Sequence, residues 1–470
     1  MALGRILFIF ANHGLWLVAR TLFHLPAEQA YLLFKYAVMA QCPIAVVACW
    51  TLARDVTRSI YTATVAALLV AVSPVFVIYS GQVMTDVPSV LLVTLALLIH
   101  FRGLTSRRMW MVLIGAMLLG AAANIRETAT FYAPWLVFAP FVSGWKFRRR
   151  EILWTILACA AFLFMAIVPF ATWYAMDLDG YRVAWKGWRE STGAEIARHP
   201  VELRNLFPYF VFFLALSPMA VVAVPVASWQ EWRERRLTPL LLLALVGLFA
   251  NVLLFFNYST VINWRYFLTG LTALVPLSAD YFMRSQTKLI GNVRHAFWSV
   301  IAGIVFITIL CGIYLRPISS EYVKKRIETK NYLARLQLLP RDAIVIAGGQ
   351  TIAVNYWHGI GAGDWQTIGT GSGWPGDNLV SEIENYLNQG RRVFLDADPN
   401  WWSPCGWQKS ETRAITKIEQ HFHFRRVSET IFEIRPMNDD SAHDAPQLER
   451  LLPEKRPGEL RGCPALDKET

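Results

Sequence analysis

Residues 152–176 read ILWTILACAAFLFMAIVPFATWYAM and contain no charged side chain. A helix of about 20 apolar residues crosses the hydrocarbon core of a bilayer, because each residue adds about 1.5 Å. Comparable runs recur through the first two thirds of the chain, and we interpret ten of them as spanning helices: 31–53, 60–80, 87–101, 109–123, 129–145, 152–176, 208–228, 239–257, 266–283 and 297–315. The sequence therefore predicts a mainly α fold, a polytopic helical membrane bundle of about ten spanning helices.

The composition supports this interpretation. Only 17% of the 470 residues are charged, whereas soluble domains carry roughly a quarter. This excludes a soluble enzyme, a disordered scaffold and a disulfide framework. The net charge of +11 would suggest nucleic acid as a partner in a soluble chain, but in a membrane protein it reflects basic loops at the cytoplasmic face. We therefore expect membrane lipids and no nucleic acid as partners.

The basic residues of the loops predict the orientation. If all ten runs cross, alternate loops share a side, and one set holds fifteen basic residues: Arg54, Arg58, Arg102, Arg107, Arg108, Lys146, Arg148, Arg149, Arg150, Arg233, Arg235, Arg236, Arg284, Lys288 and Arg294. The short loops of the other set hold only Arg126 and Arg265. Because basic loops stay in the cytoplasm, we expect a multi-pass protein of the plasma (inner) membrane with the first set inside.

Four regions follow from this division. Residues 1–30 mix basic and apolar residues and predict an interfacial or re-entrant segment, with a poor spanning helix as the alternative. Residues 31–315 form the transmembrane domain. Residues 316–436 are more polar and predict a small α/β domain, which helix parity places on the extracytoplasmic side. Residues 437–470 have too few apolar residues to fold alone and predict a disordered tail.

Within 316–436 we expect strands near 343–347, 393–395 and 430–434, with helices near 321–337 and 379–389. Whether Cys405 pairs with Cys463 stays open at this point, since spacing alone does not decide it.

Three charged segments fall at the predicted outer face of the bundle. They contain Asp86, the adjacent Arg126 and Glu127, and Arg265 followed by Tyr266. A charge near the hydrocarbon costs several kcal/mol unless it is paired or hydrated, so such residues are candidates for function. Two arginines and an aspartate at one face suggest a site for a lipid phosphate, which guanidinium groups bind bidentately.

Each segment also has a purely structural interpretation. Asp86 or Thr85 could cap the helix that follows, with Pro88 in its first turn. Arg126 and Glu127 could neutralise each other in a tight turn. Arg265 could extend to the interface beside aromatic residues.

The order of these motifs resembles the GT-C membrane glycosyltransferases, in particular the protein mannosyltransferase and lipid A aminoarabinose transferase branch. The resemblance covers about 30–315. It rests on the segment 71–80 followed by Thr85-Asp86-Val87-Pro88, on Gly115 and Gly120 before Arg126, and on Arg265-Tyr266 at the start of a late helix.

The resemblance implies an enzyme that takes a sugar from a polyprenyl-phosphate donor at the outer face and attaches it to a lipid, glycan or protein acceptor. It implies a catalytic role for Asp86 and substrate binding by Arg126, Glu127, Arg265 and Tyr266. It leaves open whether a divalent cation takes part. The chemistry suits these residue types, because arginines stabilise a leaving phosphate and a carboxylate can deprotonate an acceptor hydroxyl.

One feature of the family has no counterpart. GT-C enzymes carry their principal acidic residue in the first outer loop, but before Tyr31 the only carboxylate is Glu28. We therefore expect the chain to lack the N-terminal helix and the first-loop acidic motif, with Glu28 as an alternative base. The competing functions are a transporter or lipid flippase, and a non-catalytic lipid-binding remnant of a glycosyltransferase.

Overall fold

The computed structural model of the chain describes residues 6–25, 29–145, 148–182, 184–186, 188–189, 217–234, 237–257, 264–359, 361–368, 376–398 and 418–437. They belong to two compact units, with the boundary in the chain between Pro317 and Ile318. Glu28, Cys405, Cys463 and residues 438–470 of the expected tail lie outside the described residues.

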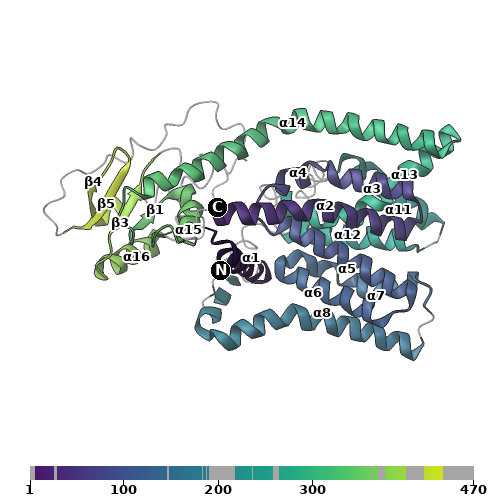
Figure 1. Cartoon of the computed structure of the whole chain (residues 1–470), viewed down its shortest axis with the longest axis horizontal. Coiled ribbons are helices and arrows are strands. Elements are labelled where there is room, and N and C mark those ends of the chain that lie inside the picture. The colour runs from purple at the N-terminus through teal and green to yellow at the C-terminus, as the bar shows by residue number, and fades with distance from the viewer. Residues whose placement is uncertain are drawn as a thin grey trace. The chain divides into compact units, whose positions relative to one another are not determined.

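The first unit is helical (Figure 1). Its elements are α1 (Ile6–Phe23), α2 (Ala30–Thr57), α3 (Ile60–Ala71), α4 (Pro74–Ser80), α5 (Asp86–Ser106), α6 (Met109–Ile125), the 3-10 helix η3 (Glu127–Tyr132), α7 (Pro134–Val142), α8 (Arg149–Met176), α11 (Pro218–Arg233), α12 (Pro239–Asn257), the 3-10 helix η6 (Trp264–Gly270), α13 (Leu271–Ile290) and the first part of α14 (Val293–Leu336).

Five described helices are long and apolar enough to cross a membrane: α1, α2, α5, α8 and residues Val293–Ile313 of α14. The pair α3 and α4 makes a sixth if it is one span, bent by 59°. The bend follows Ser73, whose hydroxyl accepts the Phe76 N–H while Pro74, lacking an N–H, starts the new helix. Helix α6 and residues Pro239–Ala250 are shorter apolar helices.

The predicted spans and the observed helices differ in several places, beginning with the bend between α3 and α4 within the expected span 60–80. The expected helix 129–145 is instead η3 followed by α7, because Pro134 opens a new helix. For the expected span 208–228, only α11 from Pro218 onward is described. The segment 1–30 contains a continuous helix, α1, whose length and composition allow it to cross. Both interpretations of this segment, a spanning helix and an interfacial helix, therefore remain open.

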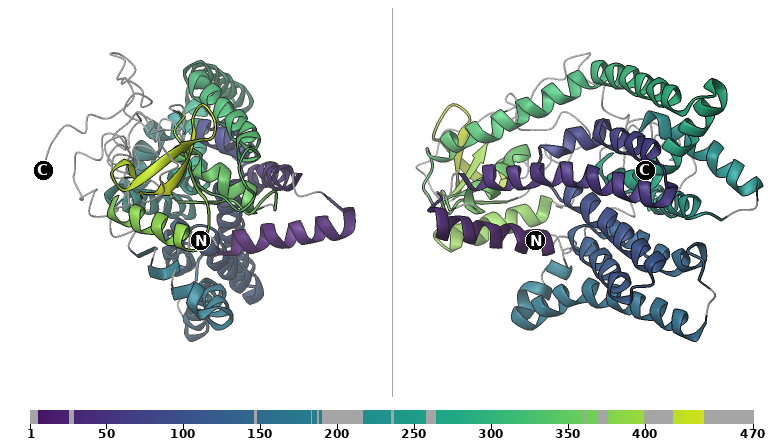
Figure 2. Two further views of the ribbon diagram at one scale, coloured as in Figure 1. Left: turned by 90° about the vertical axis from the view of Figure 1, so that its left-hand side faces the viewer. Right: turned by 45° about the vertical axis from the view of Figure 1, so that its right-hand side comes forward.

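Glycines allow the helices around α6 to pack closely. Helix α6 packs between α5 and α8, and α5 also packs against α2 (Figures 1 and 2). A Cβ atom at Gly115 would lie 2.6 Å from the backbone nitrogen of His100 in α5, and one at Gly120 would overlap the carbonyl of Phe162 in α8. Asn124 adds a hydrogen bond of 2.8 Å to the Met165 carbonyl of α8. Small residues at helix contacts are expected where lipid surrounds the helices.

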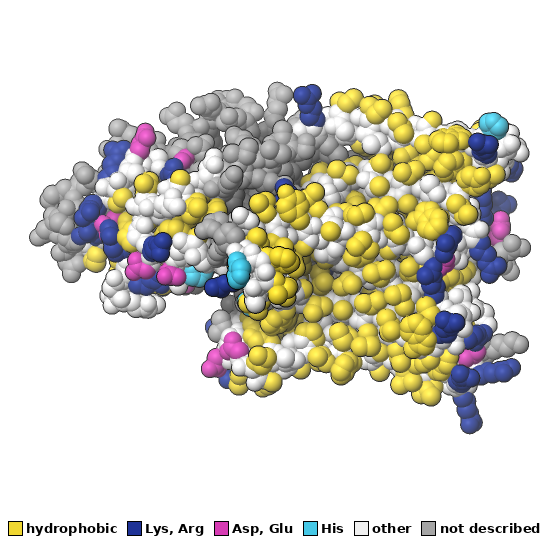
Figure 3. Space-filling model, viewed as in Figure 1, with side chains coloured by type: hydrophobic (Ala, Val, Ile, Leu, Met, Phe, Trp, Pro, Cys, Tyr) yellow, Lys and Arg dark blue, Asp and Glu magenta, His cyan; other side chains and the backbone are white. Residues whose placement is uncertain are grey.

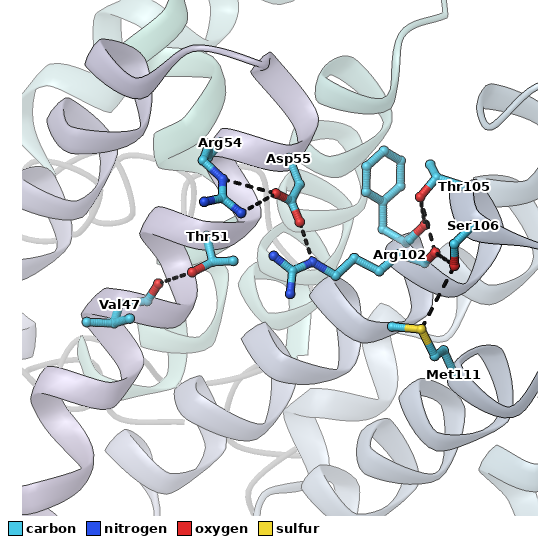
Figure 4. A network of polar contacts seen from close by, with 9 residues as sticks. Val47, Thr51, Arg54, Asp55, Arg102, Thr105, Ser106 and Met111 are labelled. Atoms are coloured by element: carbon cyan, nitrogen blue, oxygen red, sulfur yellow. Dashed lines mark hydrogen bonds and ion pairs between the residues drawn. The ribbon is translucent and has the colours of Figure 1, made fainter. Parts of the chain in front are cut away.

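Basic side chains gather at one end of the helical unit, whereas its sides are mostly apolar (Figure 3). At this end Asp55 of α2 accepts from Arg54 at 3.1 Å and from Arg102 of α5 at 2.5 Å (Figure 4). Arg107 contacts Glu151 at the start of α8, and Arg284 of α13 contacts Glu231 of α11. These pairs join the first three predicted basic loops to one another and the last two to each other. We refer to this end of the helical unit as the basic end.

The second unit contains a five-stranded sheet with the order β2-β1-β3-β5-β4. The sheet is made of β1 (Ile344–Ile346), β2 (Gln366–Thr367), β3 (Val393–Asp396), β4 (Phe422–Arg426) and β5 (Ile431–Pro436), with η7 (Gly348–Gln350), α15 (Thr351–Gly359) and α16 (Gly376–Asn388) between them. β1 is parallel to β2 and β3, whereas β5 is antiparallel to β3 and β4. The three expected strands are present, and β2 and β4 are additional.

The last turns of α14 are fixed to this sheet by a partly buried arginine. Arg335 donates to both carboxylate oxygens of Asp396 at the end of β3, and to Asp398 at 3.1 Å. The Tyr332 hydroxyl donates to the same Asp396 at 2.8 Å. Burial raises the pKa of Asp396 although these donors favour its charged form. The expected helix near 321–337 is thus the end of α14, which packs on the domain that follows it.

Candidate functional site

Asp86 is the first residue of α5 and is only 1% exposed. The residue before it, Thr85, makes no side-chain cap, and the carboxylate of Asp86 points instead into the protein, toward Arg126. The capping interpretation of this segment is therefore wrong. A carboxylate in the first turn of a helix is stabilised by the helix dipole, which compensates part of the cost of burying it.

Arg126 follows the last residue of α6, where the backbone becomes extended. Its side chain is 3% exposed, and its Nη1 donates to Oδ1 of Asp86. Because removing one partner of a buried ion pair costs about 3–5 kcal/mol, each of these charges depends on the other. The pair joins the start of α5 to the end of α6, two positions 40 residues apart.

The two carboxylate oxygens of Asp86 differ in their hydrogen bonding. Oδ2 is buried and has no hydrogen-bond partner within the described part of the chain. Buried polar atoms without a partner are rare, and they often mark the place of a ligand or water. Chemically, Oδ2 is a hydrogen-bond acceptor that a substrate hydroxyl could use.

Glu127 does not share this environment. It opens η3, its side chain is exposed, and it forms no ion pair with any described residue. The interpretation of Arg126 and Glu127 as a mutually neutralising pair is wrong, since Arg126 pairs with Asp86. Glu127 lies at the edge of the buried pair, one residue from Arg126.

Arg265 and Tyr266 lie in η6, and only their backbone is described. The backbone of η6 contacts α4, α5 and η3. The fold therefore brings the segment with Arg265 against the elements that carry Asp86 and Glu127. The side chains of Arg265 and Tyr266 lie outside what the structure describes.

The position of the pair along α5 matters for function. Asp86 is at one end of this helix and Arg102, at the basic end, is 16 residues further along it, which corresponds to about 24 Å at 1.5 Å per residue. The hydrocarbon core of a bilayer is about 30 Å thick. The Asp86–Arg126 pair and the basic end thus occupy opposite ends of the helical unit.

Two buried hydroxyls near the pair were not among the residues that the sequence singled out. Ser89 lies one turn after Asp86, and Thr128 follows Arg126 by two residues; neither hydroxyl has a partner among the described residues. The signal available for Ser89 was its i, i+3 spacing from Asp86, which puts both on one helix face. Among the described residues no group of three or more His, Cys, Asp or Glu side chains could hold a metal ion.

Comparison with known families adds an independent finding. Residues 14–173 match the family of dolichyl-phosphate-mannose-protein mannosyltransferases. The match covers about a third of the chain and includes Asp86, Arg126 and Glu127, whereas Arg265 and Tyr266 lie beyond it. It supports the GT-C glycosyltransferase superfamily, and with it a membrane enzyme that uses a polyprenyl-phosphate sugar. No curated protein shows significant similarity to the chain.

Proposed function

We propose that this chain is a membrane glycosyltransferase that moves a sugar from a polyprenyl-phosphate carrier to a lipid, glycan or protein acceptor. The observation that carries the proposal is the buried Asp86–Arg126 pair, in which Oδ2 of Asp86 has no partner among the described residues. The pair lies within the part of the chain that matches the mannosyltransferase family. The reaction takes place at the end of the bundle opposite the basic end, which we place at the outer face of the membrane.

The proposed reaction assigns one role to each group. The acceptor hydroxyl donates to Oδ2 of Asp86, its oxygen attacks the anomeric carbon, and the bond between that carbon and the carrier phosphate breaks. The electron pair leaves with the phosphate and the hydroxyl proton moves to Asp86. Arg126 holds the carboxylate of Asp86 in position through Oδ1, which leaves Oδ2 for the acceptor.

The donor phosphate needs positive charge as it leaves. In the proposal Arg265 binds it, Tyr266 donates a hydrogen bond, and Glu127 contacts the sugar from the edge of the pair. The contacts of η6 with α5 and η3 support this assignment. Since Asp86 and Arg126 are almost fully buried, part of the covering chain moves before the acceptor reaches Oδ2.

We also propose how the chain is oriented in the membrane. About ten helices cross the plasma (inner) membrane, the basic end is cytoplasmic, and the C-terminal α/β domain is extracytoplasmic. The concentration of Lys and Arg side chains at one end of the helical unit supports this orientation (Figure 3).

The test is sugar transfer from a polyprenyl-phosphate donor by the purified full chain and its variants. Asp86→Asn retains the shape of the side chain and removes the base, so we expect transfer to fall by about 100-fold or more while donor binding is retained. Arg265→Ala should weaken donor binding. The matched control is Asp55→Asn, which removes a paired aspartate at the basic end and should leave transfer unchanged.

The outcomes separate the functions. Unchanged transfer in Asp86→Asn would remove the proposed catalytic role. Tight donor binding without any transfer by the intact chain would instead indicate a non-catalytic lipid-binding protein.

A further inference from the structure

A second site candidate lies at the basic end of the helical unit. A cavity of about 460 Å³ opens between the start of α3 and the end of α13. Cavities of 300–1,000 Å³ are typical of small-molecule sites. It is lined by two cations, one carboxylate, three hydroxyl groups and two apolar side chains: Arg284, Lys288, Asp280, Ser59, Thr62, Thr287, Met283 and Val293. Asp86 lies at the other end of the unit, so this cavity is separate from the proposed transfer site.

The two cations of the cavity differ in their surroundings. Arg284 contacts Asp280 at 2.6 Å and Glu231 at 3.2 Å, and both carboxylates are largely buried. Two carboxylates therefore face this one cation and fix its position. Lys288, one turn further along α13, is exposed and forms no ion pair with any described residue. Among the described residues, the cavity thus presents one ammonium group outside any ion pair, beside the Thr287 hydroxyl.

The surface next to the cavity is apolar. Ile60 at the start of α3 and Val293 and Trp298 at the start of α14 are exposed, and the ring of Tyr61 contacts that of Phe297 at 5.3 Å between centroids. Exposed apolar and aromatic side chains beside basic ones are typical of the boundary between hydrocarbon and headgroups. The cavity therefore combines a polar interior, which presents the exposed Lys288 ammonium, with an apolar rim.

We propose that this cavity binds an anionic phospholipid at the cytoplasmic leaflet. The phosphate accepts from the Lys288 ammonium and the Thr287 hydroxyl, and an acyl chain lies against Ile60 and Val293. A phosphodiester keeps one negative charge at neutral pH, and lysine binds phosphate as a point charge. The lipid is thus distinct from the sugar donor and lies at the opposite face.

The test is native mass spectrometry of the full chain in micelles that contain phosphatidylglycerol, with phosphatidylcholine as the comparison lipid. We expect Lys288→Ala to weaken phosphatidylglycerol binding about fivefold, since one basic residue near a membrane contributes about 1 kcal/mol. Lys288→Arg should restore most of the binding. Arg108→Ala is the matched control, because Arg108 is exposed at the basic end, carries the same charge and does not line the cavity.

Three results would overturn the proposal. An equal loss in Arg108→Ala and Lys288→Ala would indicate diffuse attraction to the whole basic end. Equal affinity for phosphatidylcholine would exclude charge selection. Full displacement of phosphatidylglycerol by millimolar inorganic phosphate would indicate a small-anion site in which the apolar rim has no part. Sugar transfer is not the readout, so failure here leaves the proposed function untouched.

Discussion

Arg126 donates a hydrogen bond to Asp86 inside the helical unit, where the two side chains are 3% and 1% exposed. The pair closes the α5–α6 hairpin at the end opposite its turn, which is formed by Arg107 and Arg108. It therefore has two consequences, one for stability and one for chemistry. For the chemistry, the pair holds Asp86, the proposed base. Its contribution to the free energy of unfolding can be measured without an activity assay.

We expect Arg126→Met to lower the free energy of unfolding by about 3–5 kcal/mol, because it leaves the Asp86 carboxylate buried without its cation. Asp86→Leu combined with Arg126→Met should cost less than the two single substitutions together, since neither charge then remains. Thermal unfolding in detergent measures both effects. Asp55→Asn at the half-exposed basic end should cost about 1 kcal/mol or less. Strict additivity of the two substitutions would contradict the coupling.

The close approach of α6 and α8 gives a second prediction. Gly120→Ala places a Cβ atom against the carbonyl of Phe162, so the two helices must separate. Overpacking of this kind costs about 1–3 kcal/mol. Gly303→Ala in α14 is the control, because no atom lies within 4 Å of the added Cβ there. It should be neutral or slightly stabilising in the same thermal unfolding measurement.

The environment of Glu433 in β5 should make the stability of the C-terminal domain depend on pH. Burial alone would raise its pKa, but hydrogen bonds and charges from Arg392 and Arg435 outweigh burial and hold the pKa below its ordinary value of 4.5. A carboxyl with a lowered pKa in the folded state contributes stability above 4.5, and this stability is lost as the pH falls through the folded-state pKa. The domain should therefore open more readily as the pH falls below 4.5 than it does at pH 6.

The measurement is hydrogen exchange of the β4 and β5 amides across this interval, corrected for the intrinsic pH dependence of exchange. Glu433→Gln removes the titrating group, so its opening free energy should change less with pH than that of the wild type. Glu384→Gln, on the exposed side of α16, is the control and should follow the wild type. Identical pH profiles for wild type and Glu433→Gln would rule out this carboxyl as the source.

The apolar runs predicted much of the helical unit. The runs 87–101 and 109–123 correspond to α5 and α6, because an uninterrupted apolar segment has only one way to satisfy its backbone in lipid. The expected helix 129–145 is split because Pro134 begins a new helix, whereas Pro140 lies inside that helix, α7. The sequence becomes more polar after the last apolar run, and this change predicted that the C-terminal strands belong to a domain of their own.

The site was predictable only in part. Helix parity placed Asp86 and Arg126 at the same end of the bundle, and the structure brings them together. Their near-complete burial was not predictable, since it depends on how closely α5 and α6 approach, which glycines and side-chain packing decide. For the same reason the local interpretations, a cap at Asp86 and a neutral turn at Arg126–Glu127, were wrong. A short sequence pattern does not predict which side chains meet between two helices.

The proposed orientation gives the last prediction. Arg108 and Glu127 are exposed and lie at the two ends of α6, which has 17 residues. In a chain whose six native cysteines are replaced by serine or alanine, Arg108→Cys should react with a membrane-impermeant maleimide only after the inner face is opened. Glu127→Cys should react in intact cells. Reaction of both from one side would mean that α6 does not cross, and the reverse pattern would place the Asp86–Arg126 pair at the cytoplasmic face, where the proposed acceptor cannot reach it.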